Sequence, residues 1–202
     1  GLDVHGAPGT GWTPHDARLA PAPVAAVHRI TLHVVEREAE VAPGVRQRIW
    51  TFGGTAPGPV LRGTVGDLFE VTLVNDGTMA HGIDFHAGQG APDQVMRSLE
   101  PGESLVYRFR ADHSGAWLYH CSSMPMMQHI ANGMYGAVII NPPNLPKVDR
   151  EYVLVASQLS LGSRSGGAEV AALHRGEWAA AAVNGYPDQY GHAPLTAQVG
   201  DG

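Results

Sequence analysis

Residues 116–140 read AWLYHCSSMPMMQHIANGMYGAVII, two strand-like runs separated by a loop that is rich in possible metal ligands. The flanking runs, AWLYHC and YGAVII, combine aromatic, apolar and β-branched residues that favour strands. Between them the chain carries Cys121, its only cysteine, with His120 directly before it and His129 eight positions later. A lone cysteine is usually a small buried hydrophobe. Imidazoles and thioethers gathered around a single thiol indicate a metal site instead.

Similar strand-like segments surround this stretch. They alternate apolar and polar residues and are separated by turns that contain Gly, Pro and Asp. Helical periodicity is weak, except around residues 166–178. The pattern predicts an all-β protein with a Greek-key β-barrel or sandwich. The expected strands lie at residues 28–41, 46–52, 67–76, 103–111, 116–121, 135–143 and, further on, 150–161.

A faint internal repeat links the two ends of the chain. VLRGTVGD (60–67) and PLTAQVGD (194–201) share Leu, Val, Gly and Asp at the same offsets. Upstream of each, WTFGGTAPG (50–58) resembles AAVNGYPDQ (181–189). Similarity at a fixed spacing suggests a tandem repeat of one structural unit.

The repeat and the composition together predict three parts. Residues 1–23 carry Gly, Pro and His without periodicity, which predicts an extended N-terminal arm on the surface. We expect a complete first domain over residues 24–145 and the truncated beginning of a second domain over residues 146–202. About 50 residues are too few to bury a stable core alone.

Composition excludes several classes of partner. The 202 residues carry a net charge of −6 and are 44% hydrophobic, which suits a globular protein. The acidic balance provides no basic patch for nucleic acid or an anionic membrane. No apolar run approaches the roughly 20 residues that a membrane-spanning helix needs, so we expect no membrane span.

A second ligand-rich motif, HGIDFH, follows the strand expected at residues 67–76. It contains His81 and His86, five positions apart. In an extended stretch, side chains an odd number of positions apart point to opposite faces. We therefore expect these two histidines to serve different centres, and the same holds for the adjacent residues His120 and Cys121.

One centre would combine His81, Cys121 and His129 with Met134, the last two being expected in a loop. Two imidazoles, a thiolate and a weak thioether are the ligand set of an electron-transfer copper centre. The other centre would combine His86 and His120. Two imidazoles leave a metal under-coordinated, so that centre needs a further protein ligand and an open position.

The other histidines and the nearby methionines have ordinary interpretations. The histidines are expected at the surface or in structural roles, and the methionines are expected to pack within the loop. These residues are His5, His15, His28, His33, His113, His174 and His192, together with Met124, Met126 and Met127.

The motifs TFGGTAPGPVLRGTVGDLFEVTLVND, HGIDFHAG and YHCSSMPMMQHIANGMYGA resemble the first cupredoxin domain of copper-containing nitrite reductases and their multicopper-oxidase relatives. The resemblance covers about residues 28–161 and becomes fainter toward the end of the chain. It implies copper as the cofactor, two cupredoxin domains per chain and assembly as a homotrimer. It also implies an external electron-donor protein and a periplasmic or extracellular location.

The resemblance implies that His81, Cys121, His129 and Met134 are the ligands of a type 1 copper. The loop between the cysteine and the second histidine is one residue shorter than is typical of that family. This difference leaves open whether the copper is blue or green.

The resemblance implies that His86 and His120 are ligands of a type 2 copper that lies between neighbouring subunits. Asp84 matches the aspartate that hydrogen-bonds the substrate and helps to deliver protons. The family's third type 2 histidine belongs to the later part of the second domain, which this chain does not reach. The implied reaction is the reduction of nitrite to nitric oxide, with electrons passing from the type 1 to the type 2 copper through the Cys121–His120 linkage.

Two alternatives remain open. A laccase-like multicopper oxidase needs His-x-His pairs and typically a His-Cys-His triplet for its trinuclear copper cluster. Ser122 follows the cysteine here, and Asp84 stands two positions before His86, so ligands of such a cluster are missing. The second alternative, a cupredoxin electron carrier or an inactive fragment, follows if the type 2 site is incomplete.

Overall fold

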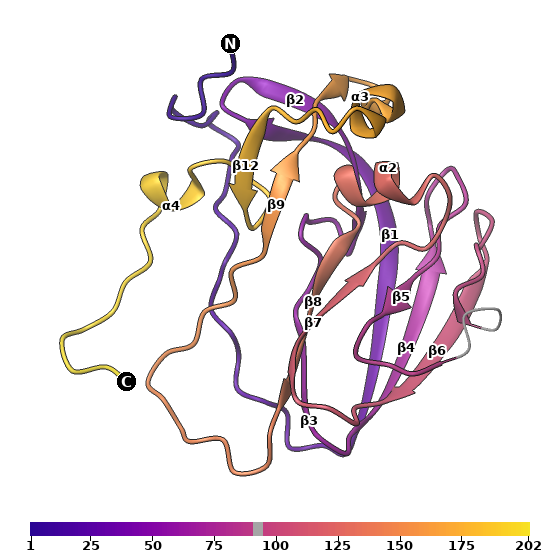
Figure 1. Cartoon of the computed structure of the whole chain (residues 1–202), viewed down its shortest axis with the longest axis vertical. Helices are drawn as coiled ribbons and strands as arrows, with labels where there is room; N and C mark the ends of the chain where they lie inside the picture. Colours follow the sequence, from indigo (N-terminus) through magenta and orange to yellow (C-terminus); the bar gives the residue numbers. More distant parts are fainter. Residues whose placement is uncertain (91–94) are drawn as a thin grey trace.

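The computed structural model describes residues 1–90 and 95–202, and its main body is a sandwich of two curled β-sheets (Figure 1). The first sheet has the strand order β2-β1-β4-β6. Strands β1 and β4 are parallel, and the other two pairs are antiparallel. The strands are β1 (Val27–Ala42), β2 (Val45–Phe52), β4 (Leu68–Asn75) and β6 (Ser104–Arg110).

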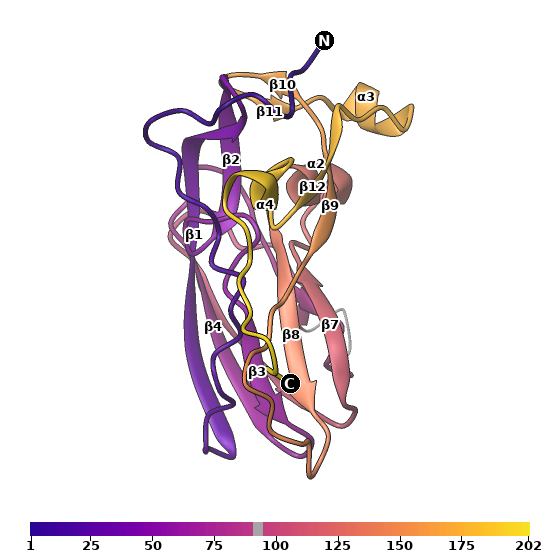
Figure 2. The ribbon, with the colours of Figure 1, turned by 90° about the vertical axis from the view of Figure 1, so that its left-hand side faces the viewer.

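The second sheet has the order β3-β8-β7-β5 and carries most of the residues discussed below. Strands β3 and β8 are parallel, whereas β8, β7 and β5 pair antiparallel. The strands are β3 (Leu61–Thr64), β5 (Asp84–Phe85), β7 (Gly115–His120) and β8 (Tyr135–Asn141). Figure 2 shows the two sheets edge-on, with β1 and β4 in one layer and β7 and β8 in the other.

The core lies between these two layers. Along β4, buried and partly buried residues alternate, and Phe69, Val71 and Leu73 are fully buried. The second layer contributes Tyr119 and Val138, which are also fully buried. Because alternating side chains of a strand point to opposite faces, a period-2 apolar pattern places one face of each sheet in this core. The all-β sandwich predicted from the sequence is therefore confirmed.

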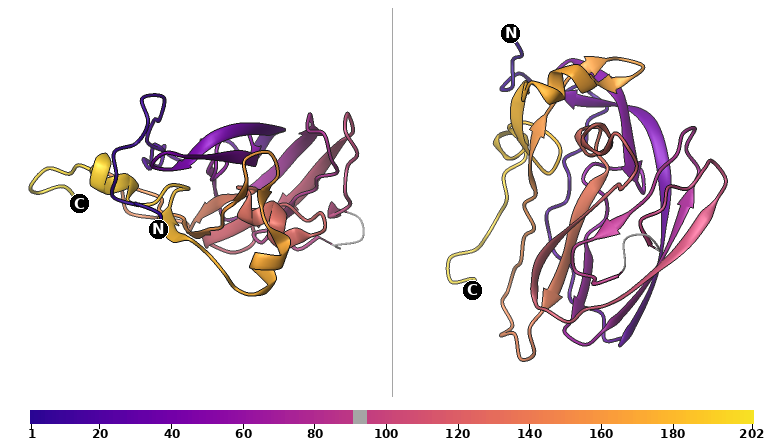
Figure 3. Two further views of the ribbon diagram at one scale, coloured as in Figure 1. Left: turned by 90° about the horizontal axis from the view of Figure 1, so that it is seen from above. Right: turned by 45° about the vertical axis from the view of Figure 1, so that its right-hand side comes forward.

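The remaining residues pack at one end of the sandwich and along one side (Figure 3). Ala17 of the N-terminal arm is buried, and Arg18 forms a β-bridge with Tyr152. A second small core joins Val41 and Leu159 with their neighbours. The elements here are α2 (Met126–Ala131), β9 (Ala156–Leu159), β10 (Gly162–Ser163), β11 (Gly167–Ala168), α3 (Val170–His174), β12 (Ala180–Val183) and α4 (Gln189–His192).

The two turns of the suspected repeat have similar backbone geometry. After β2, Gly53 and Gly54 have φ values of 76° and 91°, and Phe52 bridges to Thr55. After β12, Asn184 and Gly185 have φ values of 50° and 84°, and Val183 bridges to Tyr186. Consecutive positive φ values are typical of the tight type I′ hairpin turn, which favours Gly and Asn. This similarity agrees with a repeated unit, while the domain boundaries remain a prediction.

Across residues 1–90 and 95–202, the helices are too short or too polar for any of them to cross a membrane.

Candidate metal centres

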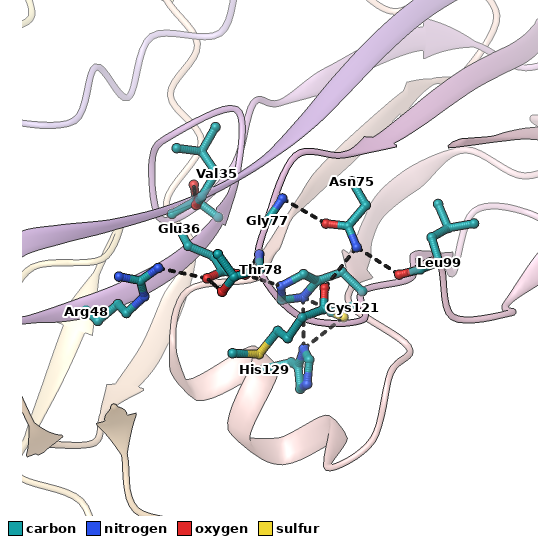
Figure 4. A network of polar contacts seen from close by, with 12 residues as sticks. Val35, Glu36, Arg48, Asn75, Gly77, Thr78, Leu99, Cys121 and His129 are labelled. Atoms are coloured by element: carbon teal, nitrogen blue, oxygen red, sulfur yellow. Dashed lines mark hydrogen bonds and ion pairs between the residues drawn. The ribbon is translucent and has the colours of Figure 1, made fainter. Parts of the chain in front are cut away.

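His81, Cys121 and His129 meet inside the sandwich and are named here the thiol cluster. Their ligand atoms all lie within 4.8 Å of one another, and all three residues are buried. The Nδ1 atoms of the two histidines are 3.1 Å apart, and Cys121 Sγ lies 3.3 Å from His129 Nδ1 and 4.0 Å from His81 Nδ1. Figure 4 shows Cys121 and His129 directed toward each other.

The strands and helix α2 fix two members of this cluster. Cys121 comes directly after β7, and its N–H donates to the carbonyl of Met134, which continues the β7–β8 pairing by one step. Met134 N–H in turn donates to the carbonyl of His129 in α2. Met134 is fully buried in the same core as Cys121. The residue that carries the candidate thioether is therefore hydrogen-bonded, through its backbone, to both Cys121 and His129.

The loop after β4 fixes the third member. His81 exchanges backbone hydrogen bonds with Leu99, at 3.1 and 2.8 Å. The buried Asn75 amide donates to the carbonyls of Leu99 and Met79, and its oxygen accepts from Gly77 N–H. Asn75 therefore holds both ends of the loop that presents His81.

The distances fit a bound metal ion. Nitrogen and sulfur ligands about 2.0–2.3 Å from a tetrahedral metal lie roughly 3.3–3.6 Å from one another. The separations of 3.1, 3.3 and 4.0 Å bracket that range. Two imidazoles with a thiol, and a buried thioether nearby, are chemically suited to copper.

Burial favours the uncharged form of all three side chains. It raises the pKa of the Cys121 thiol, against hydrogen bonds from Gly82 and Ser123. It lowers the pKa of His81, although the neighbouring Glu36 acts in the opposite direction. Burial and the charge of His81 lower the pKa of His129 to about 4. Both imidazoles are therefore neutral near pH 7 and can bind a metal through nitrogen, while a coordinated thiol would be deprotonated by the metal.

Asp84, His86 and His120 form a second group, named here the imidazole cluster. Their ligand atoms also lie within 4.8 Å of one another. The Nε2 atoms of His86 and His120 are 3.0 Å apart, and Asp84 Oδ2 lies 3.6 and 3.9 Å from them. The His86 side chain is 46% exposed, whereas that of His120 is 8% exposed. The cluster therefore opens toward the surface.

Strand register brings the imidazole cluster together. In the β5–β7 pair, Asp84 lies directly opposite His120, so their side chains share one face. His86 N–H donates to the carbonyl of Leu118, which places its ring next to that of His120. His120 Nδ1 lies 2.9 Å from the Cys121 carbonyl, which can only accept. Nδ1 therefore carries the proton, and Nε2 presents a lone pair to the cluster.

The structure brings six of the seven candidate residues together as two groups and buries the seventh, Met134, in the same core as Cys121. It also corrects the local setting of some of them. His129 lies in the short helix α2 and not in a loop. Six helical residues are too few for a helical period to appear in the sequence. The nearby methionines do not pack within a loop either: Met124 is 78% exposed, and Met126 and Met127 lie in α2, where Met126 is partly buried and Met127 is 47% exposed.

One contact of the thiol cluster was absent from the sequence-based predictions. Glu36 Oε1 lies 3.1 Å from His81 Nε2, and the Glu36 side chain is only 2% exposed. The available signal was its position in β1: Glu36 shares the inward face of the strand with Leu32 and Val34. A carboxylate at an inward position needs a partner, and the partner here is 45 positions away.

Comparison with known proteins gives consistent matches. A family model described as multicopper oxidase matches residues 33–145. The copper-containing nitrite reductase of Neisseria meningitidis serogroup A is 36% identical over 142 residues, which cover 68% of this chain and 37% of that protein.

Solved structures agree with these sequence matches. Copper nitrite reductase from Nitrosomonas europaea superposes with a TM-score of 0.74 at 40% identity, covering 79% of this chain and 57% of that one. A multicopper oxidase superposes with a TM-score of 0.73 at 30% identity, covering 85% of this chain and 58% of that one. The expected cupredoxin-type sandwich is thus confirmed, and the chain spans less than two thirds of the length of each of these relatives.

Proposed function

This chain belongs to the multicopper oxidase family, and we propose that the protein is a copper-containing nitrite reductase that forms nitric oxide. The observation that carries the proposal is the pair of ligand clusters joined at His120 and Cys121. A type 1 copper at the thiol cluster would exchange single electrons, and a type 2 copper at the imidazole cluster would bind nitrite as a Lewis acid and pass it an electron.

The thiol cluster offers what an electron-transfer centre requires. His81, Cys121 and His129 are held by strand pairing, by α2 and by the Asn75 hydrogen bonds, so their positions need not change with the charge of the metal. We propose Met134 as the weak fourth ligand. His129 also lines a cavity of about 580 Å³, together with Trp50 and Met124 among others. An external electron-donor protein could approach the thiol cluster there.

The imidazole cluster offers what nitrite chemistry requires. Reduction of nitrite to nitric oxide consumes an electron and protons and releases water. His86 and His120 present Nε2 atoms 3.0 Å apart, and the Asp84 carboxyl group next to them can hold a proton for transfer to the substrate. By family resemblance we propose a homotrimer in which a second domain of a neighbouring subunit supplies a further histidine ligand.

We also propose that residues 146–202 begin a second domain of the same fold. The similar turns after β2 and β12 support this proposal. The relatives named copper-containing nitrite reductase support a periplasmic or extracellular location by analogy only.

A multicopper oxidase is the second candidate, because a structure of that description is 30% identical to this chain. The imidazole cluster argues against a trinuclear copper cluster. Asp84 occupies the position of the first histidine of a His-x-His pair, and Ser122 occupies the position after the cysteine. The groups that remain suit a single copper ion.

Copper analysis and turnover of the full-length protein test the proposal. We expect two copper ions per chain and release of nitric oxide from nitrite when a small-molecule reductant supplies electrons. Oxygen consumption without nitric oxide formation would favour the oxidase. One copper ion per chain without turnover of nitrite would favour an electron carrier.

A further inference from the structure

The His81 ring is held at both of its nitrogen atoms. Nδ1 faces the thiol cluster, 3.1 Å from His129 Nδ1 and 4.0 Å from Cys121 Sγ. Nε2 lies 3.1 Å from Glu36 Oε1. If Nδ1 binds a metal, its lone pair is used there, and the proton of the neutral ring is on Nε2. The ring is then an N–H donor to Glu36 on the side opposite the metal.

Glu36 accepts several hydrogen bonds besides the contact with His81. Thr78 donates twice, from its backbone N–H and its hydroxyl, each at 2.7 Å. Arg48 donates from Nη2 at 2.9 Å. Figure 4 shows Glu36 between Arg48 and Thr78. Burial acts to raise the pKa of Glu36, but the hydrogen bonds from Thr78, Arg48 and His81 outweigh it and bring the pKa to about 2.

Strand register explains why these groups meet. In the β1–β2 pair, Glu36 lies opposite Trp50, and Arg48 is its diagonal neighbour on the same face. The Trp50 ring packs edge-on against the rings of His129 and His81, with centroid distances of 4.7 and 5.9 Å. The first sheet therefore contacts the thiol cluster through a charged pair and an indole. Thr78 belongs to the loop that leads to His81, so Glu36 also ties that loop to β1.

A buried carboxylate is costly unless it is paired and hydrogen-bonded. Glu36 meets both conditions, because it is paired with Arg48 and accepts hydrogen bonds from Arg48 and Thr78. The Arg48 side chain reaches the surface, where it is 36% exposed. A carboxylate that accepts the second N–H of a metal-bound imidazole fixes the ring and makes it a stronger electron donor. A stronger donor stabilises the more highly charged, oxidised metal.

We propose that Glu36 is a positioning residue that orients His81 and lowers the reduction potential of the copper centre at the thiol cluster, with Arg48 as its counter-charge. This inference rests on the proposed copper site. It assigns to Glu36 an effect that acts through His81 and not through contact with the metal.

Redox titration of the full-length, copper-loaded protein, followed by its visible absorption, tests this inference. Glu36→Gln keeps the shape of the side chain and removes its charge, and we expect the reduction potential to rise. Loss of such a partner weakens metal binding by about tenfold or more; a tenfold loss that falls on the oxidised copper alone corresponds to a rise of about 59 mV. Arg48→Gln leaves the carboxylate uncompensated, and we expect the potential to fall.

Glu38→Gln is the matched control. Glu38 is two positions along the same strand and pairs with Arg46 and Arg164 at the surface, without contact to a ligand. We expect its potential to equal that of the unsubstituted protein. If the substitutions only loosened the site, the reduction potentials of Glu36→Gln and Arg48→Gln would shift in the same direction. The electrostatic role shifts the two potentials in opposite directions.

The outcomes are distinguishable. A coloured Glu36→Gln protein with an unchanged potential overturns the inference and leaves the copper site intact. An unsubstituted protein without thiolate-to-copper absorption overturns both the proposed function and this inference. If Glu36→Gln does not accumulate, Arg48→Gln provides the test. A fall in its reduction potential supports the inference, and an unchanged potential overturns it.

Discussion

His120 and Cys121 are adjacent residues at the end of β7, yet each belongs to a different ligand cluster. His120 Nε2 lies 3.0 Å from His86 Nε2, while Cys121 Sγ lies 3.3 Å from His129 Nδ1. Consecutive side chains of an extended chain point to opposite faces, so a single peptide linkage connects the two clusters. Loss of a ligand on one face should therefore leave the other cluster in place.

His120→Ala should separate the two proposed activities. The thiol cluster keeps all of its ligands, so we expect the visible absorption of a thiolate–copper bond to remain. Nitrite turnover should fall to background, because the imidazole cluster loses its better-buried imidazole. Absorption spectra and nitric oxide release measure the two effects on one sample of full-length protein. His33→Ala, which removes an exposed histidine paired with Asp76, should change neither; nitrite reduction at an unchanged rate in His120→Ala would contradict the assignment.

The strands were predictable because their apolar residues alternate with a period of two. The segments expected at residues 28–41 and 67–76 correspond to β1 (Val27–Ala42) and β4 (Leu68–Asn75). The same alternation predicted that neighbouring ligands would face different centres. The local sequence pattern was therefore sufficient to predict most strands of the sandwich and the division of the ligands into two sets.

The helical setting of His129 and the role of Glu36 were not predictable in this way. Helix α2 is too short to show a period; it begins at Met126, directly after Pro125, which is its N-cap residue and has an extended backbone. Glu36 meets His81 only because β1 and the loop after β4 come together in the folded sheet. Long-range contacts of this kind leave at most a local clue, here a charged residue on the inward face of a strand.

Cys121→Ser should abolish the strong visible absorption of the copper-loaded protein. A serine hydroxyl is not deprotonated as readily as a thiol and cannot supply the thiolate bond. We expect copper at the thiol cluster to be lost or bound at least tenfold more weakly, as measured by competition with a chelator. Met124→Leu is the matched control, because this methionine lines the cavity that His129 also lines but is 78% exposed and outside the proposed ligand set. A Cys121→Ser protein that keeps its colour would rule out the thiolate ligand.

Gly136→Ala should destabilise the sandwich. Gly136 lies directly opposite Tyr119 in the β7–β8 pair, and a methyl group added there would overlap the Tyr119 ring. That ring is fully buried, and its hydroxyl donates to the Pro59 carbonyl at 2.7 Å, so it has little freedom to move. Overpacking of this kind costs about 1–3 kcal/mol.

Denaturant unfolding followed by tryptophan fluorescence measures this cost. Gly11→Ala is the control, because an added methyl group there would meet no atom within 4 Å. We expect its effect to stay within about 0.5 kcal/mol. Equal stability of the two variants would mean that Tyr119 does not cover Gly136 as the structure shows.

Asp84→Asn should slow nitrite reduction without disturbing the thiol cluster. Asparagine has nearly the same shape and can still face His120 across the β5–β7 pair, but it cannot donate a carboxylic proton. Loss of a general acid typically costs about 10²–10⁴-fold in rate, so we expect a fall of at least 10²-fold in kcat, with the visible absorption and the copper content unchanged. Steady-state nitric oxide production against nitrite concentration measures kcat and KM separately. Asp76→Asn is the matched control, since Asp76 is half exposed and pairs with His33, which belongs to neither cluster. A fall in copper content together with the rate would show that Asp84 is needed to bind the metal. An unchanged kcat would show that Asp84 does not deliver protons to the substrate.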